Sequence, residues 1–143
     1  MKFRDFIENG QARIAEKDMM LAKSLINGAK KDLEFLEKLK IDDNSSRKIM
    51  TNYYDTLRSI LEAISALDGF KVYSHEAFTF FLKEKNEEVL AVKFDRFRQI
   101  RNKINYYGKD ITVGETKENI KEIKRMIQIL IEKYLNELSA TLQ

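Results

Sequence analysis

The sequence predicts an all-α protein, an antiparallel bundle of four to five helices. Apolar residues recur every three to four positions along most of the chain, and no stretch sustains the alternation of apolar and polar residues that marks a strand. Proline is absent, while lysine, glutamate and isoleucine are abundant, which favours helices. A chain of 143 residues suits one domain with a buried core and is short for two, so we expect a single domain over residues 1–143.

The first long helix is expected from about Gln11 to Lys40, because apolar residues repeat there at heptad-like spacing: Ala22, Ile26, Ala29, Leu33 and Leu36. Gly28 within this helix predicts close packing against a neighbour. The polar segment 41–46 should end the helix, since its side chains compete for backbone hydrogen bonds. Ser45 or Ser46 can then cap the next helix.

Four further helices follow by the same reasoning. The second carries an apolar face of Met50, Tyr53, Leu57, Ile60, Ile64 and Leu67, and ends at Gly69. A short third helix begins at Ser74 and breaks near Asn86. The fourth runs from about Glu88 to Tyr107 and stops at Gly108. After a loop through Gly114, the fifth presents Ile120, Ile123, Ile127, Leu130 and Tyr134 on one face.

Composition excludes several kinds of site. The chain has no cysteine and one histidine, so a disulfide framework, a thiolate zinc site and a histidine-rich metal site within one subunit are ruled out. We therefore expect no metal and no cofactor. No apolar run approaches the length that spans a bilayer, and no signal-peptide core follows Met1. The expectation is a cytoplasmic protein with no membrane partner.

Arg101 is the residue that a plain helical core does not explain. The fourth helix places it inside an apolar stripe, which reads Leu90, Phe94, Phe97, Arg101 and Ile104. A guanidinium is rarely buried unless an anion or a carbonyl array meets it. Arg98, Asn102 and Asn105 form a polar stripe beside it, so this edge of the helix is the candidate phosphate-binding site.

Positive charge gathers around the same residues. Segment 93–109 holds six basic side chains and one acid, Asp95, although the whole chain carries a net charge of only +3. A solvated helix face would have the same composition. Aromatic residues alternate with the arginines, however, and Tyr106 and Tyr107 close the segment. Arginines among aromatic rings suit contacts with phosphates and bases.

His75 stands at the expected start of the third helix, where Ser74 is the cap. One interpretation is a histidine that packs or forms hydrogen bonds at a junction between loop and helix. The other is a general base or a phosphate contact, because an unperturbed histidine titrates near neutral pH. Spacing in the sequence does not bring His75 to Arg101, and only the fold could do so.

Segment 98–108, Arg-Gln-Ile-Arg-Asn-Lys-Ile-Asn-Tyr-Tyr-Gly, resembles the HEPN family (higher eukaryotes and prokaryotes nucleotide-binding domain). The upstream segments also resemble small archaeal and bacterial members: Tyr-Tyr-Asp-Thr-Leu-Arg at 53–58, Gly-Phe-Lys at 69–71 and Ser-His-Glu-Ala at 74–77. The similarity covers about residues 18–139. It implies a helical bundle that dimerises and, in active members, cleaves RNA without metal at the dimer interface.

The signature of active members is an arginine, often followed by a polar residue, then a histidine after four to six intervening residues. Arg101 matches the arginine and Asn102 the polar residue. The three places for the histidine hold Tyr106, Tyr107 and Gly108. Tyrosine titrates near ~10 and cannot replace imidazole as a base near neutral pH, so this degenerate motif argues against catalysis while leaving anion binding and dimerisation.

The resemblance also implies partners. Many small members are encoded with a minimal nucleotidyltransferase, and some carry a tyrosine near the motif that accepts AMP. Tyr106 and Tyr107 lie close to that place, at a different offset.

Three hypotheses follow. The first is a HEPN-like homodimer that binds RNA or a nucleotide phosphate through His75, Arg98, Arg101, Asn102, Asn105, Tyr106 and Tyr107 without cutting it, as part of a toxin-antitoxin-like pair. The second is a weak metal-independent ribonuclease that uses Arg101, Asn102 and either Tyr106 or His75. The third is a structural interaction bundle. The dimer interface is expected to include helix 88–107, because a bundle of this size has little reason to expose Phe94 or Phe97 unless a second subunit covers them.

Overall fold

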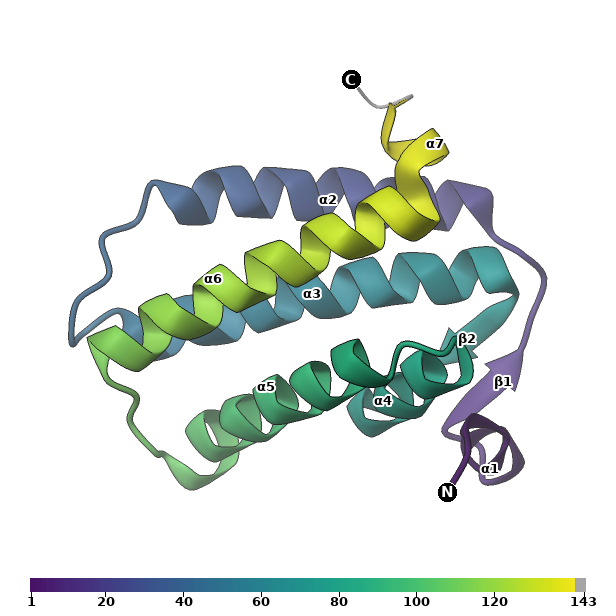
Figure 1. Cartoon of the computed structure of the whole chain (residues 1–143), viewed down its shortest axis with the longest axis horizontal. Coiled ribbons are helices and arrows are strands. Elements are labelled where there is room, and N and C mark those ends of the chain that lie inside the picture. Colours follow the sequence, from purple (N-terminus) through teal and green to yellow (C-terminus); the bar gives the residue numbers. More distant parts are fainter. Residues whose placement is uncertain (141–143) are drawn as a thin grey trace.

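The computed structural model describes residues 1–140, with side chains to residue 138, and the all-α prediction is confirmed (Figure 1). Its long helices are α2 (Met19–Glu37), α3 (Ser46–Asp68), α5 (Glu88–Tyr107) and α6 (Val113–Leu130). The shorter elements are α1 (Phe3–Glu8), β1 (Ala12–Ile14), β2 (Phe70–Val72), α4 (His75–Glu84), the π-helical turn η1 (Ile131–Leu135) and α7 (Asn136–Ala140).

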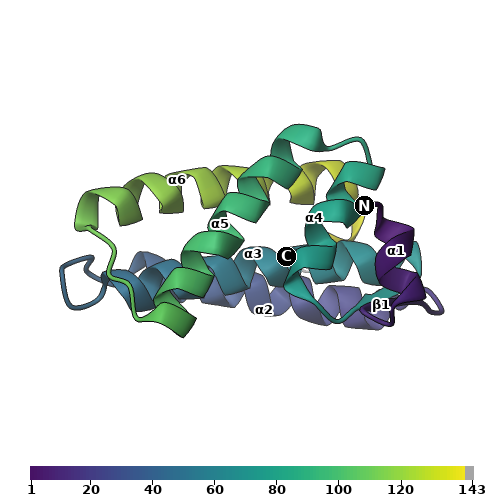
Figure 2. The same ribbon diagram turned by 90° about the horizontal axis from the view of Figure 1, so that it is seen from below.

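Successive long helices run antiparallel, and α3 lies at the centre (Figure 1). It packs against α2 on one side, against α5 on another and against α6 on a third, and α4 packs against α5 (Figures 1 and 2). Apolar residues at spacings of three and four, among them Tyr53, Leu57, Ile60 and Ile64, bury three sides of α3. A strip that holds exposed Asn52 and Asp55 and partly exposed Arg58 and Glu62 remains open to solvent.

The expected start of the first helix at Gln11 is wrong. Gly10, with φ of +84°, follows α1, and the chain then forms β1, which pairs antiparallel with β2 in the register Ala12↔Val72. Helix α2 begins only at Met19, because the side chain of Asp18 accepts a hydrogen bond from the backbone N–H of Leu21 at 2.9 Å. Three-residue strands are too short to show alternation, so the sequence pattern missed this small sheet.

The C-terminal ends of α3 and α5 lie at the glycines that the sequence predicted. Gly69 (φ +86°) and Gly108 (φ +62°) end α3 and α5 in the left-handed conformation. Neither Ser45 nor Ser46 caps α3 through its side chain. Both hydroxyls donate backwards instead, Ser45 to the carbonyl of Lys40 at 2.8 Å and Ser46 to that of Asp42 at 2.7 Å.

Two packing expectations are also wrong. A Cβ built on Gly28 would meet no atom within 4 Å, so this glycine does not mark close helix packing. Phe94 and Phe97 are both 0% exposed within the single chain. The rings of Tyr54 and Phe78 cover Phe94, with centroids 5.5 and 6.2 Å away. These phenylalanines therefore give no reason for a second subunit. No helix in residues 1–140 is both long enough and apolar enough to cross a membrane.

Candidate functional site

The side chain of Tyr54 is the centre of a polar cluster between α3, α4 and α5. Its ring is fully buried, and it stacks on Phe94 at 5.5 Å and on the imidazole of His75 at 5.7 Å. Tyr54 points toward α4 and α5 because its place on the central helix faces the side that these two helices cover. Burial raises the pKa of the Tyr54 hydroxyl, and three arginines oppose that effect. This hydroxyl is therefore protonated at neutral pH.

His75 is the first residue of α4 and is held in a fixed position. Ser74 caps the helix by accepting a hydrogen bond from the backbone N–H of Ala77 at 3.3 Å. Nδ1 of His75 lies 2.9 Å from the hydroxyl of Tyr54. Burial, followed by the positive charges of Arg58, Arg101 and Arg98, lowers the pKa of His75 from 6.5 to about 4. The imidazole is therefore neutral at pH 7 although it lies beside three cations.

Arg101 reaches the same place from α5. Its guanidinium carbon lies 6.0 Å from the ring centroid of Tyr54 and 5.4 Å from that of Tyr106. One terminal nitrogen donates to the Tyr106 hydroxyl at 3.2 Å and to the side-chain oxygen of Asn102 at 3.3 Å. Its Nε is buried and has no hydrogen-bond partner in the described part of the chain. None of the contacts given for this guanidinium is with a carboxylate, so its charge is open to an anion.

Arg58 is the cation that sequence reasoning missed. It lies one turn after Tyr54 on α3, pairs with Glu62 at 3.3 Å, and buries an Nε that also lacks a partner among the described residues. A signal was present, because Tyr54 and Arg58 are four residues apart within segment 53–58. Arg58 borders the apolar face of its helix, as Arg101 does on α5, and the same argument would have found it.

Arg98 lies nearby but is already paired. Its Nε and one terminal nitrogen lie 2.9 and 2.8 Å from the same carboxylate oxygen of Asp95. Gln99 and Thr79 also donate to this carboxylate, at 2.8 and 3.2 Å. Burial would raise the pKa of Asp95, but the hydrogen bonds and charge of Arg98 outweigh it and hold that pKa below its usual value. Arg98 thus adds positive potential to the site and has fewer free donors than Arg101.

The predicted site residues divide into two groups. His75, Arg98, Arg101, Asn102 and Tyr106 belong to the cluster around Tyr54, so the fold brings His75 to the arginines. Asn105 and Tyr107 are exposed at the end of α5, and no contact given for residues 1–140 joins them to Tyr54. The described residues contain no group of three or more acidic or histidine side chains that could hold a metal ion.

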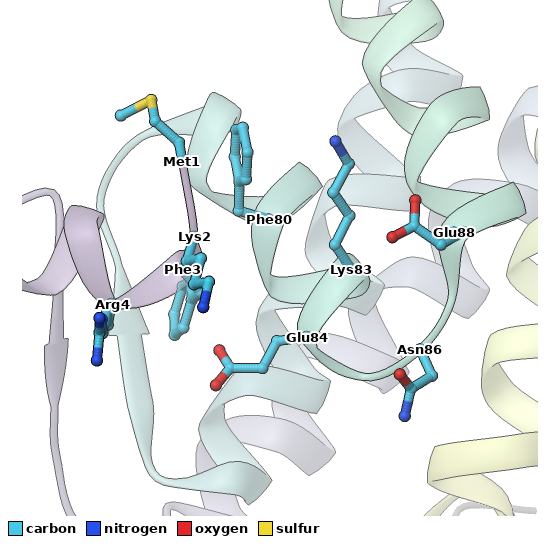
Figure 3. Close-up of a pocket in the computed structure, with 9 residues that line it drawn as sticks. All are labelled: Met1, Lys2, Phe3, Arg4, Phe80, Lys83, Glu84, Asn86 and Glu88. Atoms are coloured by element: carbon cyan, nitrogen blue, oxygen red, sulfur yellow. The ribbon is translucent and has the colours of Figure 1, made fainter.

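A separate cleft of about 520 Å³ opens between α1, α4 and the turn into α5. Figure 3 shows side chains of both signs around it: Lys2, Arg4, Lys83, Glu84 and Glu88, with the ring of Phe80 on one wall. It shares no residue with the Tyr54 cluster. Its mixed charge favours no one class of ligand.

No family model, curated protein or solved structure matches this chain.

Proposed function

We propose that the cluster around Tyr54 is a phosphate-binding site, and that the protein is a HEPN-like homodimer that binds RNA or a nucleotide without cutting it. The observation that carries this proposal is the convergence of Arg58, Arg98 and Arg101 on the buried Tyr54 and the partly buried His75. Arg98 and Arg58 have carboxylate partners in Asp95 and Glu62. The guanidinium of Arg101 donates hydrogen bonds only to neutral groups, and an anion would stabilise this partly buried charge.

The hydrogen-bond inventory supports an anionic ligand. Arg58 and Arg101 each bury an Nε without a partner in residues 1–140, and the hydrogen bonds that Arg101 donates within these residues go to neutral groups. Guanidinium groups bind phosphate oxygens through pairs of parallel N–H bonds. Exposed Tyr106, 68% accessible, lies beside Arg101 and offers a ring on which a base can stack.

Part of the dimer proposal now depends on a different surface of α5. Val89 and Val92 are 69% and 64% exposed on the outer side of this helix, and Tyr106 and Tyr107 are exposed at its end. These side chains replace Phe94 and Phe97 as the apolar contribution to an interface. Light scattering at micromolar concentration should report a dimer, and a monomer would remove this part of the proposal. A nucleotidyltransferase partner, as in a toxin-antitoxin-like pair, is proposed on the resemblance alone.

The second candidate function is a weak metal-independent ribonuclease. The observation that favours it is the position of His75, which is neutral at pH 7 and lies within the field of all three arginines. A neutral imidazole can accept a proton. The hydrogen bond between Nδ1 and the Tyr54 hydroxyl, however, already engages one ring nitrogen, and Tyr106 occupies the place of the motif histidine. We therefore rank binding without cleavage first.

RNA binding across a range of salt concentrations tests the proposal. Arg98→Ala and Arg101→Ala should each weaken RNA binding more than the control variants Lys31→Ala and Lys121→Ala do. The two controls remove exposed positive charges on α2 and α6. Arg101→Ala should have the larger effect of the two, because Arg98 is paired with Asp95. Equal losses in all four variants would mean that RNA responds only to overall charge.

A further inference from the structure

A groove of about 310 Å³ lies between α2 and α3, and its lining includes Asp55 and Ser59, which directly follow Tyr54 and Arg58 in the chain. Asp32 and Phe35 line it from α2, and Asn52, Asp55, Thr56 and Ser59 line it from α3. None of these residues belongs to the arginine cluster itself. The groove has the size of a small-molecule pocket, and it combines one flat aromatic ring with polar groups.

Hydrogen-bond acceptors dominate this groove. The hydroxyl of Thr56 donates its proton to the carbonyl of Asn52 at 2.9 Å, and that of Ser59 donates to the carbonyl of Asp55 at 3.1 Å. Both hydroxyl oxygens can therefore only accept further bonds. The carboxylates of Asp32 and Asp55 have no hydrogen bond or ion pair recorded within residues 1–140. A ligand edge that meets these two carboxylates must present N–H donors.

Phe35 supplies a stacking surface. Its side chain is 60% exposed, and no ring or cation contact is recorded for it among the described residues. An aromatic side chain that stays exposed beside polar groups suits a planar heterocycle, which can stack on the ring while its edge faces the carboxylates.

Asp55 joins the groove to the arginine cluster. Burial raises the pKa of its carboxyl group, and the charges of Arg58 and Arg101 oppose that effect, so the carboxylate lies within the field of both guanidiniums. A phosphate held by these arginines therefore leaves the attached sugar and base next to the groove. This step rests on the phosphate site of the proposed function.

We infer that the groove between α2 and α3 binds the guanine base of a nucleotide whose phosphate lies at Arg58 and Arg101. Guanine presents two parallel donors, the N1–H and the 2-amino group, which one carboxylate can accept together. Adenine and cytosine present an amino group without an adjacent ring N–H. Uracil flanks its single N–H with two carbonyl oxygens, which the carboxylates of Asp32 and Asp55 would repel.

Competition binding with the full chain tests this inference. The probes are GMP, IMP, AMP and UMP, with inorganic pyrophosphate as a probe that has no base. GMP should bind about tenfold more tightly than IMP, which lacks the 2-amino group, and UMP should bind most weakly. Arg101→Ala should weaken all five probes, because all depend on the phosphate contact.

Variants of the groove separate the base contact from the phosphate contact. Asp32→Asn should abolish the preference for GMP over IMP and leave pyrophosphate binding unchanged. Asp55→Asn should reduce that preference while tightening pyrophosphate, because it removes a negative charge beside Arg58 and Arg101. Phe35→Ala should weaken all four nucleotides about tenfold without affecting pyrophosphate. Met20→Ala, also on α2 and 83% exposed, is the matched control and should change nothing.

Each other outcome overturns the inference in a distinguishable way. If pyrophosphate binds with dependence on Arg101 but the four nucleotides bind equally, the guanine site is wrong and the phosphate site stands. The same conclusion follows if Asp32→Asn keeps the preference for GMP. If neither pyrophosphate nor any nucleotide binds, the phosphate site and the guanine site are both wrong.

Discussion

The hydroxyl of Tyr54 and Nδ1 of His75 lie 2.9 Å apart, in a hydrogen bond that joins the middle of α3 to the first turn of α4. The tyrosine is fully buried and its ring also stacks on the imidazole, so His75 has one fixed orientation. No hydrogen bond recorded for residues 1–140 uses the other ring nitrogen, Nε2. Both groups interact electrostatically with Arg58, Arg98 and Arg101.

Removing this hydrogen bond should have a measurable effect on stability. Tyr54→Phe keeps the ring and its stacking and loses the hydroxyl, so the free energy of unfolding should fall by about 1 kcal/mol. Urea denaturation measures the change. The control is the same change in a His75→Ala background, where the partner of the hydroxyl is gone and Tyr54→Phe should cost less. An equal loss in both backgrounds would show that the bond to His75 contributes nothing of its own.

Stability should depend on pH through His75. The folded state has a pKa of about 4 for this group against 6.5 for an unperturbed histidine, so between these values the unfolded chain binds the additional proton. The contribution of His75 is therefore fully present above pH 6.5 and is lost as the pH falls toward 4. The loss should be about 1–2 kcal/mol, allowing for solvent screening of a partly exposed ring.

The readout is the free energy of unfolding of wild type and His75→Asn at several pH values. Asparagine keeps a polar group beside Tyr54, and the carboxylates titrate alike in both proteins. The wild type should lose more stability than the variant between pH 7 and pH 4. Parallel curves would mean that His75 titrates normally in the folded protein.

Helical periodicity was sufficient to predict most of the fold. A long apolar stripe such as that of α3 must be buried against other helices, and this holds before the exact packing is known. It failed at β1 and β2, where three-residue strands carry no period and are stabilised by their pairing with each other. It also failed for Phe94 and Phe97. The rings that cover Phe94 are those of Tyr54 and Phe78, which come from distant parts of the sequence.

The sequence also predicted only some of the candidate site residues and contacts. Arg101 was recognisable because a charge inside an apolar stripe conflicts with its own helix. The place of His75 in the site could not be recognised from the sequence. His75 lies 21 positions after Tyr54, and the packing of α4 against α5 brings the two residues together. The ion pair of Arg98 with Asp95 could have been predicted from their i, i+3 spacing. That prediction would have shown that Arg98 is less available to a ligand than Arg101.

Arg58 should contribute to RNA binding, although its ion pair with Glu62 makes it less available than Arg101. It carries one of the two buried Nε groups without a partner in the described residues, so Arg58→Ala should weaken RNA binding about tenfold. The slope of log affinity against log salt should become about one less steep. Arg125→Ala, an exposed arginine on α6, is the control and should change affinity less than twofold. Indistinguishable affinities for the two variants would exclude Arg58 from the site.

The wild-type protein should show no metal-independent RNA cleavage above background. If the missing imidazole is the only deficit, Tyr106→His should restore weak cleavage, because Tyr106 already contacts Arg101 at 3.2 Å. A positioned acid-base group is typically worth ~10²–10⁴ in rate, which a gel assay detects. Arg101→Ala in that background should abolish the gain. Robust cleavage by wild type that disappears in His75→Ala would instead support the ribonuclease.

The most direct test of the phosphate site is an NMR titration of His75, which is the one histidine of the chain and therefore gives unambiguous ring signals. Without ligand its pKa should be about 4. Saturating pyrophosphate would place negative charge beside the imidazole and should raise that pKa toward about 6, while Arg101→Ala should prevent the rise. A pKa of His75 that stays at the same value with and without pyrophosphate would contradict a phosphate site at the Tyr54 cluster.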